Sequence, residues 1–497
     1  MRIEWNRASE SDGQPVYRQI ADAVRSAIAR HGLGGGARLP TIRNLASQLG
    51  VHRDTIATAY ESLAADGVIE SAVGRGTFVA NGERVAAAAV EPPTFTPTLA
   101  PAALRLLDFE RARPRFGSAR DAVPMHALVP DPALYPADAF RRALNRALGA
   151  GGPELLLYGS PQGHPGLREA LSRRMREASL PVEADDLVLC HGASQGIALA
   201  LRLFCAPGDV LALEEPTYNN VLGAALALGI ETTAVPMRED GVDLELLERT
   251  LARPEVKAFY TIPTFHNPMG TTTSESHRRA LLELARGTGV PVIEDGYEMD
   301  LRFEGRPVPP LAGLDASGLV VHLFSFSKSL FPGARVGAVS ARGRLREALL
   351  ALKQASDLSD ALPLQAALAE FVGSGEYDRH LAKLRRVLRR RRDALHGALE
   401  RHMPAGARWT APEGGYQVWL ELAEPLDTRE LLADAVAAGV LFAPGSQFHH
   451  DGRPSNALRL TFAMADEAQL ESGVERLAQV IAAHRAGGAT GAHPVPV

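Results

Sequence analysis

Lysine and cysteine are scarce in this sequence of 497 residues. Only four of the 53 basic residues are lysines, and all four lie in the second half of the chain. Chemistry that needs a primary amine on a side chain therefore has four candidates: Lys257, Lys328, Lys353 and Lys383. The two cysteines, Cys190 and Cys205, are too few for a disulfide framework or a zinc–cysteine cluster, and no metal site is predicted.

Long apolar runs are absent as well. No stretch approaches the roughly 18 apolar residues that a membrane helix needs. The N-terminal stretch MRIEWNRASESDGQP contains acidic residues and no apolar core, so it does not resemble a secretory signal. These two absences predict a cytoplasmic protein without a membrane partner.

An excess of positive charge is also missing. The formal net charge is -5 at pH 7, and the first 80 residues contain nine arginines against eight acidic residues. Binding to nucleic acid is therefore not indicated by the overall charge. If it occurs, its phosphate contacts must come from a local cluster of basic side chains.

The sequence divides into two units joined by a linker. Residues 81–120 are rich in Ala, Pro and Arg and lack sustained apolar periodicity, which is typical of a linker. The units that it separates span residues 13–80 and 121–485, and residues 486–497 are predicted to be a low-order tail. Because 46% of all residues are hydrophobic, both units can build full cores.

The small unit is predicted to be a winged helix-turn-helix. Three stretches with helical spacing of apolar residues precede VIESAVGRGTFVA, which is typical of two strands around a glycine turn. Thr41 is the expected N-cap of the second helix and Gly50 its stop. In such a fold the helix after the turn presents its first turn to base edges, and the wing approaches a groove. The candidate DNA-binding residues are Arg43, His52, Arg53, Thr55, Arg75 and Gly76.

Residues 16–79 closely resemble the DNA-binding domain of the GntR family of bacterial transcription regulators. The resemblance runs from VYRQIADAVRSAI through LPTIRNLASQLGVHRDTIATAYESLAADG to the wing GRGTFV. It implies DNA contacts at Arg43, Arg53, Thr55 and the wing residues 74–76. His52 departs from the family, which commonly has a helix-capping Ser or Thr there.

The large unit alternates apolar strands with amphipathic helices, which predicts an α/β fold with a mainly parallel sheet. Ligands of such sheets lie at the carboxyl ends of the strands. Lys328 follows the apolar run LVVHLFSFS, so its amine is expected at such an end, where it could form a Schiff base with an aldehyde. The other three lysines are interpreted as surface charges. Nearby Ser325, Ser327 and Arg335 suit a phosphate.

An aldehyde and a phosphate together suggest pyridoxal phosphate, and the other requirements of this cofactor can be tested against the sequence. Ala193 and Ser194 open a helix after the strand DLVLC and could bind the phosphate through backbone N–H groups. Asp295 could keep the pyridine nitrogen protonated, and Tyr218 could stack on the ring. The remaining candidates, for the phenolic oxygen, are Asn267 and Tyr297.

The ordered motifs YGSPQGHPGLREAL, GASQG, EEPTY, HNPMG, EDGY, SFSK and PGARVG resemble fold-type I aminotransferases, which have a smaller C-terminal α+β subdomain. The resemblance implies that Lys328 forms the internal aldimine with the cofactor. It gives Asp295, Tyr218, Asn267, Tyr297 and the phosphate residues the roles already suggested. It adds Tyr158, which would reach the phosphate of the neighbouring subunit in a dimer. It also adds Arg459, which would bind an α-carboxylate bidentately.

The combination of the two units resembles the MocR subfamily of GntR regulators. The favoured hypothesis is a regulator that binds operator DNA, forms a head-to-tail homodimer and senses an amino compound, or pyridoxal phosphate itself, through Lys328. One alternative is a working aminotransferase for an α-amino acid, since the lysine, aspartate and arginine set is complete. Another is an architectural DNA-binding protein whose large unit binds no ligand.

Two further expectations concern charged side chains. No basic residue adjoins Tyr218 in the sequence, where Asn219 and Asn220 follow, so a second carboxylate of the effector has no predicted partner. The arginine-rich stretch from 384 to 395 is interpreted as a solvated helix face and not as a nucleic-acid site.

Overall fold

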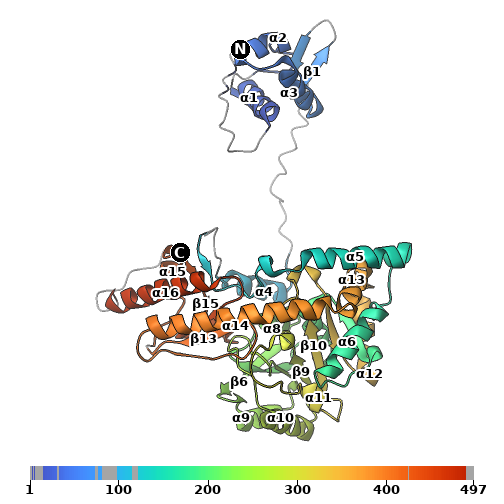
Figure 1. The fold of residues 1–497 in the computed structure, drawn as a ribbon, viewed down its shortest axis with the longest axis vertical. Helices are drawn as coiled ribbons and strands as arrows, with labels where there is room; N and C mark the ends of the chain where they lie inside the picture. The colour runs from blue at the N-terminus through green and yellow to red at the C-terminus, as the bar shows by residue number, and fades with distance from the viewer. Residues whose placement is uncertain are drawn as a thin grey trace. The chain divides into compact units, whose positions relative to one another are not determined.

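A computed structural model describes residues 3, 5, 15–30, 33–72, 76–80, 98–114, 121–423 and 425–487. The chain divides into two compact units, Met1–Thr98 and Leu99–Val497, which we describe separately (Figure 1). Within these described ranges, no helix is both long and apolar enough to cross a lipid bilayer.

The small unit consists of three helices and a two-stranded wing. The helices are α1 (Val16–Arg30), α2 (Ile42–Leu49) and α3 (Arg53–Ala65), and the antiparallel strands are β1 (Ile69–Ala72) and β2 (Gly76–Val79). The core between them is formed by buried apolar side chains that include Ile20, Val24, Leu45, Ile56 and Leu63. The predicted winged helix-turn-helix is confirmed.

Local sequence signals set the limits of α2. The hydroxyl oxygen of Thr41 accepts a hydrogen bond from the backbone N–H of Asn44 at 3.2 Å, as an N-cap does. Gly50 ends the helix at a φ of 67°, a left-handed conformation that glycine adopts readily. The turn between α2 and α3 is therefore tight, and it brings the first turn of α3 beside α2.

The large unit is built on an eight-stranded sheet with the order β4-β11-β10-β9-β8-β5-β6-β7. The five strands from β10 to β6 are parallel to one another, whereas β11 runs antiparallel to both of its neighbours. This arrangement confirms the mainly parallel sheet. The strand bounds are β4 Leu187–Cys190, β5 Val210–Glu215, β6 Glu231–Arg238, β7 Gly241–Val242, β8 Val256–Thr261, β9 Val292–Asp295, β10 Val320–Ser325 and β11 Gly337–Ser340.

The helices α7 to α12 alternate with these strands along the chain. Apolar side chains from the sheet and these helices form two buried clusters, one including Leu213 and Leu323 and the other Phe259 and Leu281. The bounds are α7 Gly192–Phe204, α8 Asn219–Ala227, α9 Leu244–Leu251, α10 Glu275–Thr288, α11 Leu311–Leu314 and α12 Gly343–Asp357.

The C-terminal part forms a smaller α+β subdomain, as predicted. Its four-stranded antiparallel sheet has the order β12-β13-β16-β15, and a short parallel pair joins β14 to β3. The strand bounds are β12 Arg408–Trp409, β13 Gln417–Glu421, β14 Val440–Leu441, β15 Ala443–Pro444, β16 Ala457–Thr461 and β3 Val123–Pro124. The other helices of the large unit are α5 Ala137–Gly151, α6 Pro165–Glu177, α13 Leu362–Gly373, α14 Glu376–His402, α15 Leu432–Ala437 and α16 Glu467–Gly487.

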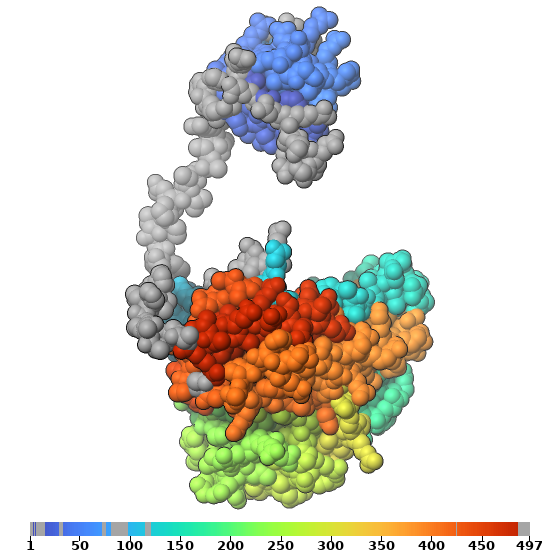
Figure 2. Space-filling view, turned by 60° about the vertical axis from the view of Figure 1, so that its left-hand side comes forward, coloured from blue at the N-terminus to red at the C-terminus, as the bar shows by residue number. Residues whose placement is uncertain are grey.

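The arginine-rich stretch lies on α14, which packs beside α16 on one face of the large unit (Figure 2). Arg386, Arg389 and Arg390 are exposed, in agreement with a solvated helix face. Arg391 is an exception, because it is buried and pairs with Asp131 at 2.7 Å.

The predicted linker 81–120 is partly helical. The helix α4 (Pro101–Arg111) packs against α8 and belongs to the large unit. None of its side chains is buried. A helix without a buried face needs no sustained apolar periodicity, and for this reason its sequence resembled a linker. Residues 81–97, 115–120 and 488–497 lie outside the described residues.

Candidate functional site

A cavity of about 210 Å³ lies where the strands β4, β5, β9 and β10 end. The sequence-predicted cofactor residues line this cavity, with the single exception of Tyr158. Parallel strands explain why they meet, since their carboxyl ends share one edge of the sheet. The lining comprises Leu128, Ala193, Ser194, Tyr218, Asn220, Asn267, Asp295, Tyr297, Ser325, Ser327, Lys328, Pro332 and Arg335.

Lys328 follows β10, and its amine donates a hydrogen bond to the backbone oxygen of Leu128. Burial lowers the pKa of this amine below its ordinary value, and the carboxylate of Glu298 partly opposes that shift. A lower pKa leaves more of the amine unprotonated, which is the form that attacks a carbonyl carbon. The environment therefore activates this lysine as a nucleophile.

Asp295 is the last residue of β9 and is buried. The phenol of Tyr260 donates to its Oδ2 atom at 2.7 Å, whereas its Oδ1 atom is buried without a partner in the described part of the chain. Burial raises the pKa of Asp295 to about 6. A cation or an N–H donor placed against Oδ1 would satisfy this atom and favour the ionised carboxylate.

The opposite end of the cavity is formed by the first turn of α7. Gly192 has a φ of 75°, and a Cβ atom there would lie 3.2 Å from Nη1 of Arg335. Glycine is therefore favoured by the turn, and it leaves room for the close approach of the guanidinium, which also donates to the backbone oxygen of His191 at 2.9 Å. Together with the backbone of Ala193 and Ser194, this arrangement is suited to an anion.

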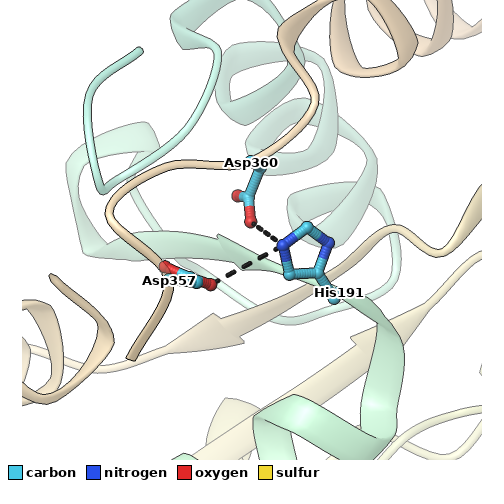
Figure 3. Close-up of side chains that lie close together, drawn as sticks. All are labelled: His191, Asp357 and Asp360. Atoms are coloured by element: carbon cyan, nitrogen blue, oxygen red, sulfur yellow. Dashed lines mark ion pairs between the residues drawn. The ribbon is translucent and has the colours of Figure 1, made fainter. Parts of the chain in front are cut away.

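The first turn of α7 is tied to a cluster of charged side chains, part of which Figure 3 shows. Nε2 of His191 lies 3.2 Å from Asp360 and 3.7 Å from Asp357. The amine of Lys353 lies 3.0 Å from both carboxylates. The interpretation of Lys353 as a surface charge was wrong, because this side chain is fully buried and paired. Lys257 and Lys383 are exposed, as expected.

The small unit presents its own candidate residues near the turn between α2 and α3. Arg43, His52 and Arg53 are exposed, and Thr55 is partly exposed. His52 is the N-cap of α3, with its Nδ1 atom accepting from the backbone N–H of Asp54 at 3.4 Å. It therefore occupies the capping position that a Ser or Thr commonly fills.

Of the candidate wing residues, the described part of the chain includes only Gly76. Gly76 opens β2 with a φ of 113°, and the side chain of Arg38 lies beside it. Arg75 and Gly74 lie outside the described residues. Arg38, which was not predicted as a candidate, is exposed and adds a cation next to the wing.

Comparisons with known proteins cover both units. The family model of class I and II aminotransferases matches residues 131–477, and that of the bacterial regulatory proteins of the gntR family matches residues 16–79. The chain is 29% identical over 479 residues to the probable rhizopine catabolism regulatory protein MocR of Rhizobium meliloti, spanning 96% of this chain and 95% of that protein. The chain is a MocR-type member of the GntR regulators.

Its large unit belongs to the class I and II aminotransferases. It is 36% identical over 367 residues to aromatic-amino-acid aminotransferase 1 of Thermococcus litoralis, covering 73% of this chain and 88% of that enzyme. LysN, the α-aminoadipate aminotransferase of Thermus thermophilus, was solved with N-(5'-phosphopyridoxyl)-L-leucine. It matches with a TM-score of 0.69 and 30% identity, over 78% of this chain and 96% of that one. The predicted fold is confirmed, and fold and neighbours support pyridoxal phosphate as the cofactor.

The unsatisfied polar atoms around the cavity of this MocR-type chain provide an independent test of that cofactor. Within the described residues, the acceptor Oδ1 of Asp295, the donor Nδ2 of Asn267 and the hydroxyl of Ser327 are buried without a hydrogen-bond partner. A pyridinium N–H, a phenolic oxygen and a phosphate are complementary to these three groups. Because unsatisfied buried polar atoms are rare, this complementarity indicates that the residues fit pyridoxal phosphate.

Arg459 lies on β16 and is buried. It donates to Oδ1 of Asn267 and to the backbone oxygen of His126, both at 2.9 Å, and its guanidinium lies 4.9 Å from the centre of the Phe448 ring. It is not among the residues that line the cavity, and it is connected to the lining through Asn267. Tyr158 is 85% exposed and lies on the surface beside exposed Leu156 and Leu157.

Glu298, which was not predicted as a site residue, acts electrostatically on Lys328. Glu298 is buried, and within the described structure its Oε1 atom has no hydrogen-bond partner. Burial raises its pKa, and the amine of Lys328 opposes this shift. An acidic residue directly after Tyr297 was visible in EDGYE, but only the fold shows that it turns inward.

A basic residue does approach Tyr218 in space. Arg113, which follows α4, lies 3.2 Å from Oδ1 of Asn220, and the amide of Asn220 donates to the hydroxyl of Tyr218 at 2.7 Å. The expectation that no cation is near Tyr218 held only along the sequence. A separation of about 100 residues between Arg113 and Asn220 hid this contact.

Proposed function

We propose that this chain is a pyridoxal-phosphate-dependent transcription regulator that binds operator DNA through its small unit and senses an amino compound in its large unit. The observation that carries the proposal is the similarity over almost the full length, 96% of the chain, to a protein named as a regulator. A separate enzyme would need only the large unit. Since operator DNA is its target, we place its action in the cytoplasm.

When bound, pyridoxal phosphate supplies an aldehyde that condenses with amines and a ring that accepts electrons. Lys328 would hold it covalently, and Asp295 would face the ring nitrogen. Ala193, Ser194, Ser325 and Arg335 would surround the phosphate. The sites for the phenolic oxygen and the ring face are assigned to Asn267, Tyr297 and Tyr218.

Glu298 and Lys328 would share one proton, which could move between the carboxylate and the amine. Glu298 is buried and Lys328 half-buried, so the ionised form of either is favoured mainly when the other carries the opposite charge. When Lys328 is a free amine, Glu298 would transfer its proton to Nζ, and it would take the proton back when the lysine is to react as an uncharged amine. Arg459 would bind the carboxylate of the effector through its planar guanidinium.

On the DNA side, Arg43, Arg53, Thr55 and the wing with Arg75 and Gly76 would contact the operator. His52 would set the start of the reading helix by capping it. We propose a head-to-tail homodimer, in which Tyr158 reaches the phosphate of the other subunit. Exposed Leu156 and Leu157, which adjoin Tyr158, support an interface at this surface. Leu157→Glu should give monomers in sedimentation velocity if this surface is the interface.

The decisive experiment is a DNA mobility-shift titration with the DNA upstream of its own gene, with and without pyridoxal phosphate and a panel of amino acids. We expect specific retardation and a change of affinity with one class of amino compound. A coupling of 1–3 kcal/mol, about five- to 150-fold, is typical of linked sites.

The second candidate function is transamination of an α-amino acid. It is favoured by the presence of Lys328, Asp295 and Arg459 in one region, since a sensor of the cofactor alone needs no carboxylate site. A steady-state assay with amino acids and keto acids tests it. Repeated turnover at ordinary enzyme rates, with no retardation of the upstream DNA, would replace the first proposal by the second.

A further inference from the structure

The carboxylate of Glu215 is the centre of a buried hydrogen-bond cluster that none of the assigned roles uses. Glu215 ends β5 and is 7% exposed. The Nδ1 atoms of His449 and His450 lie 2.9 Å from Oε1 and Oε2, and the backbone N–H of His450 donates to Oε1 at 3.1 Å. Arg453 donates to Oε2 at 3.1 Å. Four donors from one loop thus converge on one carboxylate.

Protonation is well defined in this cluster. An ionised carboxylate only accepts, so both histidine Nδ1 atoms must carry a hydrogen. Burial alone would raise the pKa of Glu215, but the hydrogen bonds from His449 and His450 outweigh it and bring the pKa below its ordinary value. The hydrogen bond to Glu215 raises the pKa of His450. Because Arg453 already donates to the oxygen that His450 uses, we assign the cluster to hydrogen bonding and not to a metal ion.

The loop that Glu215 holds, residues 445–453, lies between β15 and β16 of the small subdomain and contacts the end of β5 in the large sheet. Its first part is a short 3-10 helix, η7 (Gly445–Phe448), and the backbone N–H of Thr217 donates to the oxygen of Phe448 at 2.8 Å. The ring of Phe448 is buried, lies 4.9 Å from the Arg459 guanidinium and packs edge-on against Trp419 at 5.7 Å. Phe448 thus supports one face of the arginine that is assigned to the effector carboxylate.

We propose that Glu215 is a positioning residue that holds Arg459 in place for a carboxylate-bearing amine, by fixing the 445–453 loop and the Phe448 ring beneath the guanidinium. This inference deepens the proposed function and rests on it for the role of Arg459. An arginine without this support would have to be ordered at each binding event, which lowers affinity. The cluster thereby selects amino acids over simple amines.

The test compares ligands that differ only in the carboxylate. Full-length protein loaded with pyridoxal phosphate is titrated with L-alanine and with ethylamine, and binding is followed by the visible absorbance of the cofactor. The wild type should bind L-alanine more tightly than ethylamine. Glu215→Gln keeps the size but loses the charge, and it should reduce this preference about tenfold while affinity for ethylamine changes less than about twofold.

The pH profile provides a readout that a purely structural role would not change. Glu215 is faced by His449, His450 and Arg453, and Asp451 contacts Arg453 at 3.4 Å. The raised pKa of His450 means that its charged contact exists at lower pH and is lost as the pH rises through that pKa. The preference of the wild type for L-alanine should fall over that range, and Glu215→Gln should show a flat profile.

Asp451→Asn is the matched control, since Asp451 lies in the same loop and is exposed, and its carboxylate contacts the guanidinium and the backbone N–H of Arg453. It should keep the preference for L-alanine. Because the charge of Asp451 adds to the raised pKa of His450, the fall of this preference should move to lower pH in the control but should not disappear. If Glu215→Gln does not fold, His450→Ala and the pH profile of the wild type carry the test. Hydrogen exchange of the 445–453 segment in the cofactor-free full chain adds a measurement that needs no cofactor, and its protection should fall in His450→Ala.

Three outcomes would overturn the proposal. They are a wild type without preference for L-alanine over ethylamine, an equal loss for both ligands in Glu215→Gln, and unchanged protection of the loop in the variants. The proposed function fails differently. If the ligand preferences behave as expected but no amino compound alters DNA binding, the chain is not an effector-controlled regulator, whereas the role of Glu215 in positioning Arg459 stands.

Discussion

The two units use arginine in opposite ways. In the small unit the candidate contacts Arg43 and Arg53 are exposed and lie on neighbouring helices close in sequence. In the large unit Arg459 is buried, hydrogen-bonded and supported by a ring from another segment. An exposed arginine that meets a polyanion needs little preparation, because long-range attraction and the partner's own geometry order it. A buried one that selects a small carboxylate must be positioned before the ligand arrives.

The same contrast holds for unsatisfied polar groups. The candidate DNA contacts are exposed or partly exposed to solvent, so they lose no hydrogen bonds when DNA is absent. Around the cavity, Asp295 and Asn267 each keep one buried atom without a partner in the described chain. Such atoms cost stability until a ligand satisfies them. Mutations at the cavity should therefore change cofactor binding and stability, whereas mutations at the candidate DNA contacts should change only DNA affinity.

The largest effect is expected from Lys328→Ala. The only amine that lines the cavity among the described residues is lost, so covalent attachment of pyridoxal phosphate should disappear completely, together with the response of DNA binding to amino compounds. Basal DNA affinity should stay within about twofold, because Lys328 and the candidate DNA contacts lie in different compact units. Absorbance after borohydride reduction measures the covalent attachment of the cofactor, and the mobility shift measures the DNA affinity and its response to amino compounds. A reduced adduct that persists in this variant would show that another residue holds the cofactor.

Asp295→Asn tests the cost of the unsatisfied carboxyl. A carboxyl whose folded-state pKa is raised stabilises the protein below its unfolded pKa, and this contribution is lost as the pH rises through the folded value. For Asp295 that folded-state pKa is about 6. Between about pH 4 and pH 7 the free energy of unfolding of the cofactor-free wild type should therefore fall by about 3 kcal/mol more than that of Asp295→Asn. Denaturant unfolding of both proteins at several pH values measures it. An identical pH dependence in the two proteins would contradict the burial of an ionisable Asp295.

Arg53→Ala should weaken operator binding by about 1–3 kcal/mol while pyridoxal phosphate stays bound. Arg18→Ala is the matched control, since it removes the same charge from an exposed position on α1. It should reduce affinity only slightly and equally for all sequences. Fluorescence anisotropy with operator and random DNA separates the two. If both variants behave alike, α3 is not the reading helix.

Arg113→Gln should have a smaller effect on the large unit. Arg113 donates to Asn219 and Asn220 over 3.4 and 3.2 Å, and both bonds are long and have neutral acceptors. Losing them should loosen Asn220 and the Tyr218 ring and lower cofactor affinity about three- to fivefold. Arg111→Gln, two positions earlier, is the control, since Arg111 is exposed and pairs with Asp108, about one turn earlier on the surface of the same helix. Equal cofactor affinities for both variants and the wild type would show that Arg113 does not contribute to cofactor binding.

Much of this arrangement could be predicted because its signals are local. Thr41 and Gly50 bound α2 by their own chemistry, and most of the predicted cofactor residues lie at or just beyond the carboxyl end of an apolar strand, where the parallel strands share one edge of the sheet. What escaped prediction depends on contacts between distant segments. Lys353 looked like a surface charge because one partner, Asp357, is the last residue of its own helix and the other, Asp360, lies in the loop beyond it. Arg113 and Glu215 meet their partners across more than 100 residues. The helix α4 escaped because none of its side chains is buried.

The smallest effect concerns His52, the residue that departs from the pattern of its family. Its ring accepts from the backbone N–H of Asp54 at 3.4 Å, a long bond, and the side chain is 78% exposed. His52→Ala should therefore cost only about 0.5–1 kcal/mol at the start of α3, and His52→Ser should restore it, since serine is a better cap than histidine. Hydrogen exchange of the α3 peptides in the full chain measures the change. If His52→Ser protects α3 but weakens operator binding, histidine contributes a DNA contact that compensates for its poorer capping.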